Sequence, residues 1–368
     1  MQLQELSSKA TEQLARLRTN LIRAGLVEFL ATFDPVEFVP ARWIKARQCV
    51  NDPLRLLVDF FLLNQSVEME GLDAKLGDSW RVLTDLGLAA TLSDRYVRMN
   101  GYILVAPFGI VLFVEPPKAR PKLYYSGDSF ALLSRISTRK SERALDLCAG
   151  SGVQGLRLAL GASDVDAVEL DPDVCRILQI NVAFNDLLDR VNVVNGSLFD
   201  QLDRSKSYDV VVSNPPFVPS LEGGPLPAYA EGGIDGLIVT RAILNELPHF
   251  LSPKGRAQLI GMLLTDDQMP LAFDELRTIA KENHLDLRLT LLARSEVSET
   301  SNYFKVIVSM AQEMTGRSAA ALSTELREVL DRQGAKAACT YSLLVTKGSG
   351  LAECQDFRLK RPIRSWFI

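Results

Sequence analysis

From Leu132 onward, short apolar segments alternate with amphipathic helical segments, and this alternation is the feature that most constrains the fold. Strands that alternate with helices in this way form a parallel sheet that is covered by helices on both faces. We therefore expect a doubly wound α/β domain over residues 132–368. Its strand candidates are RALDLCAG, VDAVEL, VNVVNG, YDVVVSNPP and GRAQLIGML.

Residues 1–115 have a different pattern, in which helices come first and a β-ribbon follows. The segment Pro53–Leu63 opens with proline at a first-turn position and is then apolar at helical spacing. A second helical stripe runs from Leu76 to Leu86. This order predicts a mainly helical, winged-helix-like domain for substrate recognition or dimerisation, joined to the α/β domain by a proline-rich linker, residues 116–131.

The composition restricts the classes of partner. The chain has 41 basic and 45 acidic residues, a net charge of −4, which is well short of a basic nucleic-acid footprint but does not exclude nucleic acid. Its five cysteines form no CxxC pair, so neither a disulfide framework nor a zinc site is expected. The longest apolar run, Tyr102–Val114, is too short to span a bilayer and reads as two strands around a turn. We expect a cytoplasmic protein without membrane segments or a bound metal, whose oligomeric state the sequence leaves open.

The segment Leu145–Leu160 runs from a strand through a glycine-rich turn into a helix. Gly150, Gly152 and Gly155 fit G-x-G-x-x-G, which provides a tight turn and close backbone approach to a ligand. Glu169 follows the next strand, where a carboxylate binds ribose hydroxyls. The loop suits either a nicotinamide dinucleotide or S-adenosylmethionine. The chain has only two histidines, neither in a context for hydride transfer, and this favours the methyl donor.

Four segments together resemble a class I S-adenosylmethionine-dependent methyltransferase of the N-P-P-[FY] group: LDLCAGSG, AVELDP, GSLFD and YDVVVSNPPF. That group includes the glutamine N5-methyltransferases of release factors and amino-group methyltransferases that act on nucleic-acid bases. The segment Gly232–Leu237 is similar to the one that follows this turn in the release-factor enzymes. The resemblance covers about residues 140–265. It implies a Rossmann-like fold, S-adenosylmethionine as cofactor, and methyl transfer to a planar amide or amino nitrogen of a protein glutamine or a nucleic-acid base.

The resemblance also implies which residues bind the cofactor. Asp146 would orient the glycine loop or the methionine ammonium group. Ser197 stands where this group often has an adenine-contacting aspartate, and its hydroxyl can still accept a hydrogen bond. The full predicted set is Asp146, Ala149, Gly150, Gly152, Gly155, Glu169, Leu170, Ser197, Leu198 and Asn214.

The turn after the fourth strand, VVSNPPFVPS, carries the catalytic prediction. An amide or aryl amine is a poor nucleophile because its nitrogen lone pair is delocalised, and acceptors on its N–H groups favour localisation of the lone pair. The side-chain carbonyl of Asn214 and the main-chain carbonyl of Pro215 are two such acceptors. Proline fixes φ and lacks an N–H, so the turn is rigid. Phe217 offers a flat apolar face for a planar group.

The sequence also supports other residue roles and alternative functions. Tyr124, Tyr125 and Asp128 are expected either to cover the cofactor or substrate or to pack, and Glu222–Gly236 is expected to be a mobile substrate loop. The main alternative function is a small-molecule methyltransferase that acts on an amino acid or a biosynthetic intermediate. A winged-helix regulator that only senses the cofactor would not need the intact Asn-Pro-Pro-Phe turn. A dinucleotide oxidoreductase is the third alternative.

Overall fold

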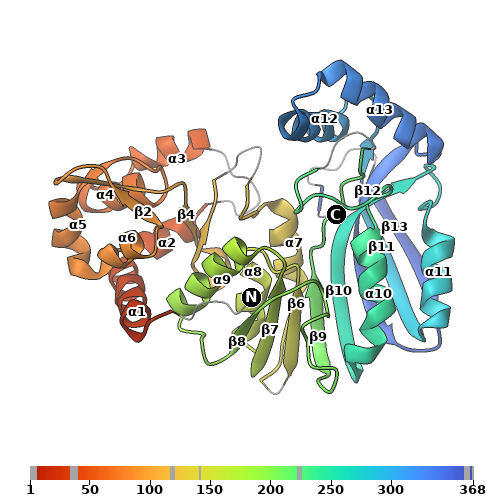
Figure 1. The fold of residues 1–368 in the computed structure, drawn as a ribbon, viewed down its shortest axis with the longest axis horizontal. Coiled ribbons are helices and arrows are strands. Elements are labelled where there is room, and N and C mark those ends of the chain that lie inside the picture. Colours follow the sequence, from red (N-terminus) through yellow and green to blue (C-terminus); the bar gives the residue numbers. More distant parts are fainter. Residues whose placement is uncertain are drawn as a thin grey trace.

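The centre of the molecule is a mixed sheet of eight strands in the order β13-β11-β12-β10-β9-β6-β7-β8, with helices on both faces (Figure 1). The structure, a computed structural model, describes residues 6–33, 40–116, 121–140, 142–221, 226–359 and 365–366. The strands of this sheet are β6 (Arg143–Leu147), β7 (Asp164–Glu169), β8 (Val191–Asn195), β9 (Tyr208–Ser213), β10 (Leu251–Thr265), β11 (Leu285–Glu296), β12 (Ala337–Lys347) and β13 (Ala352–Leu359).

The five predicted strands, β6 to β10, are all present and pair in parallel, which confirms the doubly wound, Rossmann-like fold. The remainder of the sheet is not parallel, because β12 lies between β10 and β11 and is antiparallel to both. β11 is a strand that the sequence analysis left out. Its alternating apolar and polar residues, LDLRLTLL, carry an ordinary strand signal.

Two apolar layers cover the faces of the sheet. On one face, buried residues of α8 and α9 form one continuous cluster with the N-terminal helices, and on the other face α10 and α11 pack against β9 to β12. The pair α12 and α13 stands above the carboxyl end of β10 (Figure 1) and has its own small core. These helices are α8 (Val153–Ala159), α9 (Pro172–Phe184), α10 (Ile238–Phe250), α11 (Phe273–Glu282), α12 (Asn302–Thr315) and α13 (Ala319–Arg332).

The N-terminal part is mainly helical, as expected, and carries a three-stranded antiparallel sheet in the order β1-β3-β2. The predicted helical stripe from Leu76 to Leu86 is interrupted, because Gly77 adopts φ +60 and starts a 3₁₀ turn. The winged-helix interpretation stays a prediction. The elements are α1 (Ser8–Arg23), α2 (Leu26–Ala31), α3 (Pro40–Arg47), α4 (Asp52–Phe61), β1 (Val67–Glu68), α5 (Met69–Leu76), η1 (Gly77–Arg81), α6 (Val82–Asp85), β2 (Ala89–Thr91) and β3 (Tyr96–Met99).

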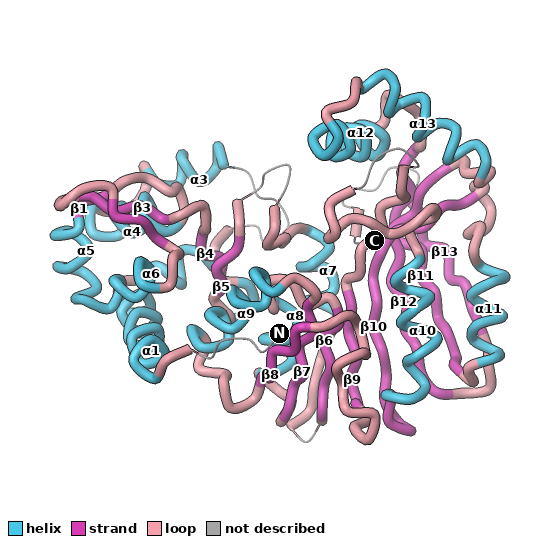
Figure 2. The backbone as a smooth tube through the Cα atoms, viewed as in Figure 1, coloured by secondary structure: helices cyan, strands magenta, loops and turns pink. Residues whose placement is uncertain are grey.

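A two-stranded sheet, β4 (Ile103–Val105) and β5 (Leu112–Val114), joins the N-terminal part to α9 (Figure 2). The buried amide of Asn181 accepts from the N–H of Phe113 at 2.8 Å and donates to its carbonyl at 3.0 Å. Asn185, one helical turn further, bonds both main-chain groups of Val111 in the same way. The two asparagines therefore satisfy a strand edge inside the core, where unpaired backbone groups are costly.

The helix α7 (Gly127–Arg135) begins inside the segment predicted as a linker, because Ser126 and Ser129 form a capping box at its start. Of that linker, residues 117–120 lie outside the described residues. No helix in the described part of the chain is long and apolar enough to cross a bilayer.

Candidate active site

The predicted site residues gather at one edge of the sheet. The strand order reverses between β6 and β9, and in such sheets ligands bind outside the carboxyl ends of the strands at this switch point. The glycine loop follows β6, Glu169 ends β7, Ser197 follows β8, and Asn214 follows β9. Parallel pairing brings all four strand ends to the same edge.

The glycine loop is bent by alternating left-handed residues, Cys148 (φ +60), Gly150 (φ +54) and Gly152 (φ +83). The φ of +83 at Gly152 favours glycine, and a Cβ there would lie 2.0 Å from Cδ1 of Leu178, so the leucine side chain would have to move. A Cβ on Gly150 would instead enter open space. The loop thus presents bare backbone to its outer side, which is what close approach of a ligand requires.

Asp146 stabilises the glycine loop through a hydrogen bond to its main chain. Its buried Oδ2 accepts from the N–H of Gly155 at 2.7 Å, and a Cβ on Gly155 would lie 3.2 Å from the same oxygen. Burial raises the pKa of Asp146 to about 8, and the charge of Glu169 adds to the shift, so the carboxyl group is largely neutral at pH 7. The contact with Gly155 supports the loop-orienting role that the sequence analysis considered.

Glu169 has both carboxylate oxygens in use. Oε2 accepts from the N–H of Gly150 and Oε1 from the N–H of Asp171, each at 2.9 Å. Burial raises the pKa of Glu169, and the two main-chain bonds oppose that shift. The carboxylate therefore ties the glycine loop to the end of β7, and its remaining lone pairs can accept from a ligand.

The other predicted cofactor residues differ in exposure. Leu170 is 62% exposed and leaves an apolar surface beside Glu169. Ser197 is exposed, and Leu198 adopts φ +47 directly after it. Ala149 is buried and donates its N–H to the carbonyl of Val168 at 3.0 Å, so its backbone supports the loop.

Asn214 is held by Asp128, which the sequence analysis expected either to help cover the cofactor or substrate or to pack. Its Nδ2 donates to Oδ2 of Asp128, on α7, at 3.1 Å. Because a carboxylate only accepts, the amide must turn its NH₂ group towards Asp128. Its Oδ1 then points the other way, and this buried oxygen has no hydrogen-bond partner among the described residues.

Two aromatic side chains, Tyr124 and Tyr229, lie near the pair of Asn214 and Asp128. Burial raises the pKa of Asp128, and hydrogen bonds from Asn214, the main chain and Tyr124 oppose that shift. The ring of Tyr124 stacks on Tyr229 with centroids 5.4 Å apart. Burial also raises the pKa of Tyr124, so its phenol stays neutral. Asp128 thus contacts Asn214 and Tyr124 lies beside Asp128, while a role for them in covering the cofactor or substrate stays a prediction.

Phe217 packs edge-on against Trp366 near the end of the chain, with ring centroids 5.8 Å apart. The carbonyl of Trp366 accepts from Nη2 of Arg135 at 2.6 Å, so the last residue of α7 holds the tryptophan in place. The same helix therefore positions Asn214 through its first turn and Trp366 through its last. A sequence pattern gives no signal for this contact.

The loop after the Asn-Pro-Pro-Phe turn is held by main-chain hydrogen bonds where it is described. Val218 and Ser220 donate their N–H groups to the carbonyls of Ala230 and Gly233, both at 2.8 Å. A Cβ on Gly236 would lie 2.3 Å from the carbonyl oxygen of Phe217, which explains the glycine there. Residues 226–236 therefore lie against the Asn-Pro-Pro-Phe turn, the mobility of this loop stays a prediction, and residues 222–225 lie outside the described residues.

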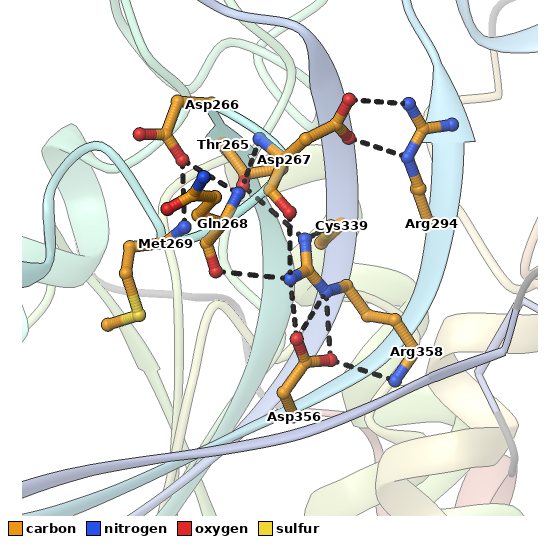
Figure 3. Close-up of polar contacts among 9 residues, drawn as sticks. All are labelled: Thr265, Asp266, Asp267, Gln268, Met269, Arg294, Cys339, Asp356 and Arg358. Atoms are coloured by element: carbon orange, nitrogen blue, oxygen red, sulfur yellow. Dashed lines mark hydrogen bonds and ion pairs between the residues drawn. The ribbon is translucent and has the colours of Figure 1, made fainter.

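An arginine network fixes the last strand at the same edge (Figure 3). Arg358 of β13 bonds the carboxylate of Asp356 and donates to the carbonyls of Asp267 and Gln268 at 3.3 and 3.2 Å. The neighbouring carboxylate of Asp267 pairs with Arg294 at 2.7 Å. These contacts lock the turn after β10 onto β13, from which the chain continues towards Trp366.

The family "Methyltransferase small domain" matches residues 127–287, which is the stretch from α7 into β11 that contains these groups. In this stretch the glycine loop and the Asn-Pro-Pro-Phe turn occupy neighbouring strand ends.

Two curated glutamine methyltransferases are similar to part of this chain. A ribosomal protein uL3 glutamine methyltransferase of Bordetella pertussis is 39% identical over 31% of this chain and 41% of its own length. A release factor glutamine methyltransferase of Clostridium acetobutylicum is 35% identical over 34% of this chain and 48% of its own. The chain thus spans less than half the length of these relatives. Among solved structures, Trm5b of Pyrococcus abyssi aligns over 70% of this chain and 62% of its own, with 13% identity and a TM-score of 0.41.

Proposed function

We propose that this protein transfers a methyl group from S-adenosylmethionine to the side-chain amide nitrogen of a protein glutamine. The observation that carries the proposal is the buried Oδ1 of Asn214, which has no partner among the described residues and is aimed away from Asp128. Such an oxygen is suited to accept an N–H of the substrate. The similarity to two glutamine methyltransferases favours an amide over a base or a metabolite as acceptor.

The residues at the strand ends fit the proposed cofactor. The open space beside Gly150 admits a ligand close to the backbone, and Glu169 retains acceptor capacity for hydroxyl groups. The exposed Leu170 offers an apolar surface to a base, with Ser197 and Leu198 on the next strand end. When bound, S-adenosylmethionine supplies an electrophilic methyl group on its sulfonium sulfur.

The turn itself prepares the acceptor nitrogen. Oδ1 of Asn214 accepts one N–H of the amide, and the carbonyl of Pro215 is a second acceptor. Together they hold the nitrogen in one orientation and favour its lone pair as a nucleophile. Ionised Asp128 polarises the Asn214 amide through the 3.1 Å hydrogen bond, which makes Oδ1 a stronger acceptor at a site of low dielectric constant.

The aromatic walls complete the acceptor side. Phe217 gives a flat surface for the amide plane, and Trp366 closes its edge. The stacked pair Tyr124 and Tyr229 lies on the side of Asp128. Exclusion of water by these rings strengthens the hydrogen bonds to Asn214. The N-terminal domain would supply substrate selectivity, and a cytoplasmic location stays a prediction.

The test is mass spectrometry of a cell lysate that has been incubated with the protein and isotopically labelled S-adenosylmethionine. We expect peptides that are heavier by one labelled methyl group, with the label on a glutamine side chain. The Asn214→Ala variant should give no such peptide while still binding S-adenosylmethionine in calorimetry. Label on a nucleic acid or a metabolite, with none on protein, would refute the glutamine assignment.

A further inference from the structure

A third side chain contacts the glycine loop, in addition to Asp146 and Glu169. Asn181, on α9, donates from Nδ2 to the main-chain carbonyl of Ser151 at 3.0 Å. Ser151 stands between the two left-handed glycines of the loop and is only 1% exposed. The two carboxyl groups accept from main-chain N–H groups, whereas the amide of Asn181 donates to a carbonyl oxygen. The loop is therefore held through both kinds of main-chain polar group.

A second contact from α9 lies beside the first. A Cβ on Gly152 would be 2.0 Å from Cδ1 of Leu178, so the leucine side chain fills the space next to this glycine. Leu178 and Asn181 are three residues apart, and their side chains therefore lie on the same face of the helix. Both are completely buried. One face of α9 thus packs directly on the glycine loop.

The same amide group also binds the ribbon formed by β4 and β5. Its Oδ1 accepts from the N–H of Phe113 at 2.8 Å, and its Nδ2 donates to the carbonyl of Phe113 at 3.0 Å. An amide nitrogen carries two hydrogens, so one goes to Phe113 and the other to Ser151. The ring of Phe113 packs on Phe184 of α9, with centroids 5.0 Å apart. Asn181 thus joins the β4–β5 ribbon and the glycine loop through one side chain.

Asn185, one turn further at the end of α9, provides a comparison within the same helix. It accepts from the N–H of Val111 at 2.9 Å and donates to the carbonyl of Val111 at 2.7 Å, so it binds the ribbon in the same way as Asn181. Its second hydrogen goes to the main-chain carbonyl of Asn181 at 2.8 Å, inside the helix. The difference between the two asparagines is therefore the bond to Ser151.

We propose that Asn181 is a positioning residue for S-adenosylmethionine, which couples the glycine loop to the β4–β5 ribbon. The ribbon lies before residues 127–287, the stretch that the methyltransferase family matches, and it belongs to the same apolar cluster as the N-terminal helices. The N-terminal part therefore contributes to cofactor binding, in addition to the acceptor selectivity proposed for it. This role rests on the proposed binding of S-adenosylmethionine and is independent of which acceptor is methylated.

Calorimetry with S-adenosylmethionine, in the absence of any acceptor, tests the bond to Ser151. Asn181→Leu is similar in size but leaves the carbonyl of Ser151 unpaired in the core. It should bind S-adenosylmethionine about tenfold more weakly, the effect of one lost buried hydrogen bond. Asn185→Leu is the matched control, because it removes equivalent bonds to the ribbon, and it should bind nearly as tightly as the wild type. Equal weakening in the two variants, or none in either, overturns the role of Asn181.

A measurement on the wild-type protein decides the question even if Asn181→Leu does not fold. Coupling between two sites is reciprocal, so a cofactor that fixes the glycine loop must also stabilise the ribbon. Hydrogen exchange followed by mass spectrometry should therefore be slower in peptides that cover β4 and β5 when S-adenosylmethionine is saturating. Peptides from the separate sheet β1-β3-β2 are the control and should not change. Protection of the glycine loop without protection of the ribbon contradicts the coupling.

Failure of this role is distinguishable from failure of the proposed function. If the wild type does not bind S-adenosylmethionine, the proposed function and the role of Asn181 are both refuted. If the wild type and Asn181→Leu bind the cofactor equally well, only the role of Asn181 is refuted. If the wild type shows the expected coupling but methylates a nucleic acid, the glutamine assignment is refuted and the positioning role stands.

Discussion

Asn214 donates a hydrogen bond to Asp128 at 3.1 Å, although the two residues are 86 positions apart in the chain. This contact decides which end of the asparagine amide faces the acceptor site. A carboxylate takes the NH₂ group, so the oxygen is left for the substrate. The first turn of α7 and the turn after β9 thus act as one unit.

The first prediction concerns Asn214. Replacement by alanine removes the acceptor for the substrate N–H, so kcat should fall on the order of 10²-fold or more. Affinity for S-adenosylmethionine, measured by calorimetry, should change little. Ser213→Ala is the matched control, because it removes the neighbouring 2.9 Å bond to the carbonyl of Leu147 without touching the substrate side. Loss of cofactor binding in Asn214→Ala would show that the residue is misplaced.

The second prediction concerns Asp128. An Asp128→Asn variant can donate as well as accept, so the orientation of Asn214 is no longer specified and kcat should fall about 10- to 100-fold. Burial raises the pKa of Asp128, and below that pKa the protonated carboxyl group can donate to Oδ1 and turn the amide. Wild-type kcat should therefore decline as the pH is lowered, and this decline should be absent in Asp128→Asn. Parallel pH profiles for the two proteins would contradict the orienting role.

The strand ends could be predicted from the sequence, but the unit around Asn214 could not. Gly150, Glu169 and Asn214 follow strands that a local alternation reveals, and parallel pairing then brings them together. The link to Asp128 depends on how α7 packs against β9, and no spacing in the chain encodes that. Along the chain, Trp366 is even further from Asn214 than Asp128 is. Its position depends on the packing of the sheet and on the hydrogen bond from Arg135.

The antiparallel half of the sheet was missed for a different reason. Leu285–Glu296 has a regular strand pattern that was left out of the five candidates, whereas the position of β12 between β10 and β11 is a long-range property. The glycines after the Asn-Pro-Pro-Phe turn were interpreted as a source of mobility. At Gly236 the structure adds another requirement, a close approach to the carbonyl of Phe217.

The third prediction concerns Glu169. Glu169→Ala removes the acceptor for the N–H groups of Gly150 and Asp171 and for the proposed ribose hydroxyls, so S-adenosylmethionine should bind more weakly by about 1–3 kcal/mol. Glu169→Gln keeps the shape and one acceptor oxygen and should lose less. Calorimetry on both variants measures the difference. An unchanged affinity in Glu169→Ala would exclude the ribose role.

The fourth prediction concerns Asp146 and the pH dependence of stability. Its pKa is about 8 in the folded protein and about 3.9 in an unfolded chain, so between these values the folded state holds the extra proton. Stability should therefore fall as the pH rises from about 4 to about 8, by up to about 1.4 kcal/mol per pH unit from this group. Asp146→Asn keeps the oxygen that accepts from Gly155 but does not titrate. Thermal unfolding at pH 6 and pH 8 should show a smaller loss in the variant than in the wild type.

The last prediction concerns Trp366. Its ring closes the edge of Phe217, and Arg135 holds its carbonyl, so its removal opens the acceptor side and leaves the cofactor residues in place. Trp366→Ala should raise KM for the acceptor protein about tenfold, with a smaller change in kcat, since one aromatic contact contributes about 0.5–1.5 kcal/mol beyond the area it buries. Trp366→Phe should restore most of the affinity because it keeps an aromatic edge. A Trp366→Ala variant with wild-type KM would mean that the acceptor does not reach this ring, and the binding surface would then lie nearer Tyr124 and Tyr229.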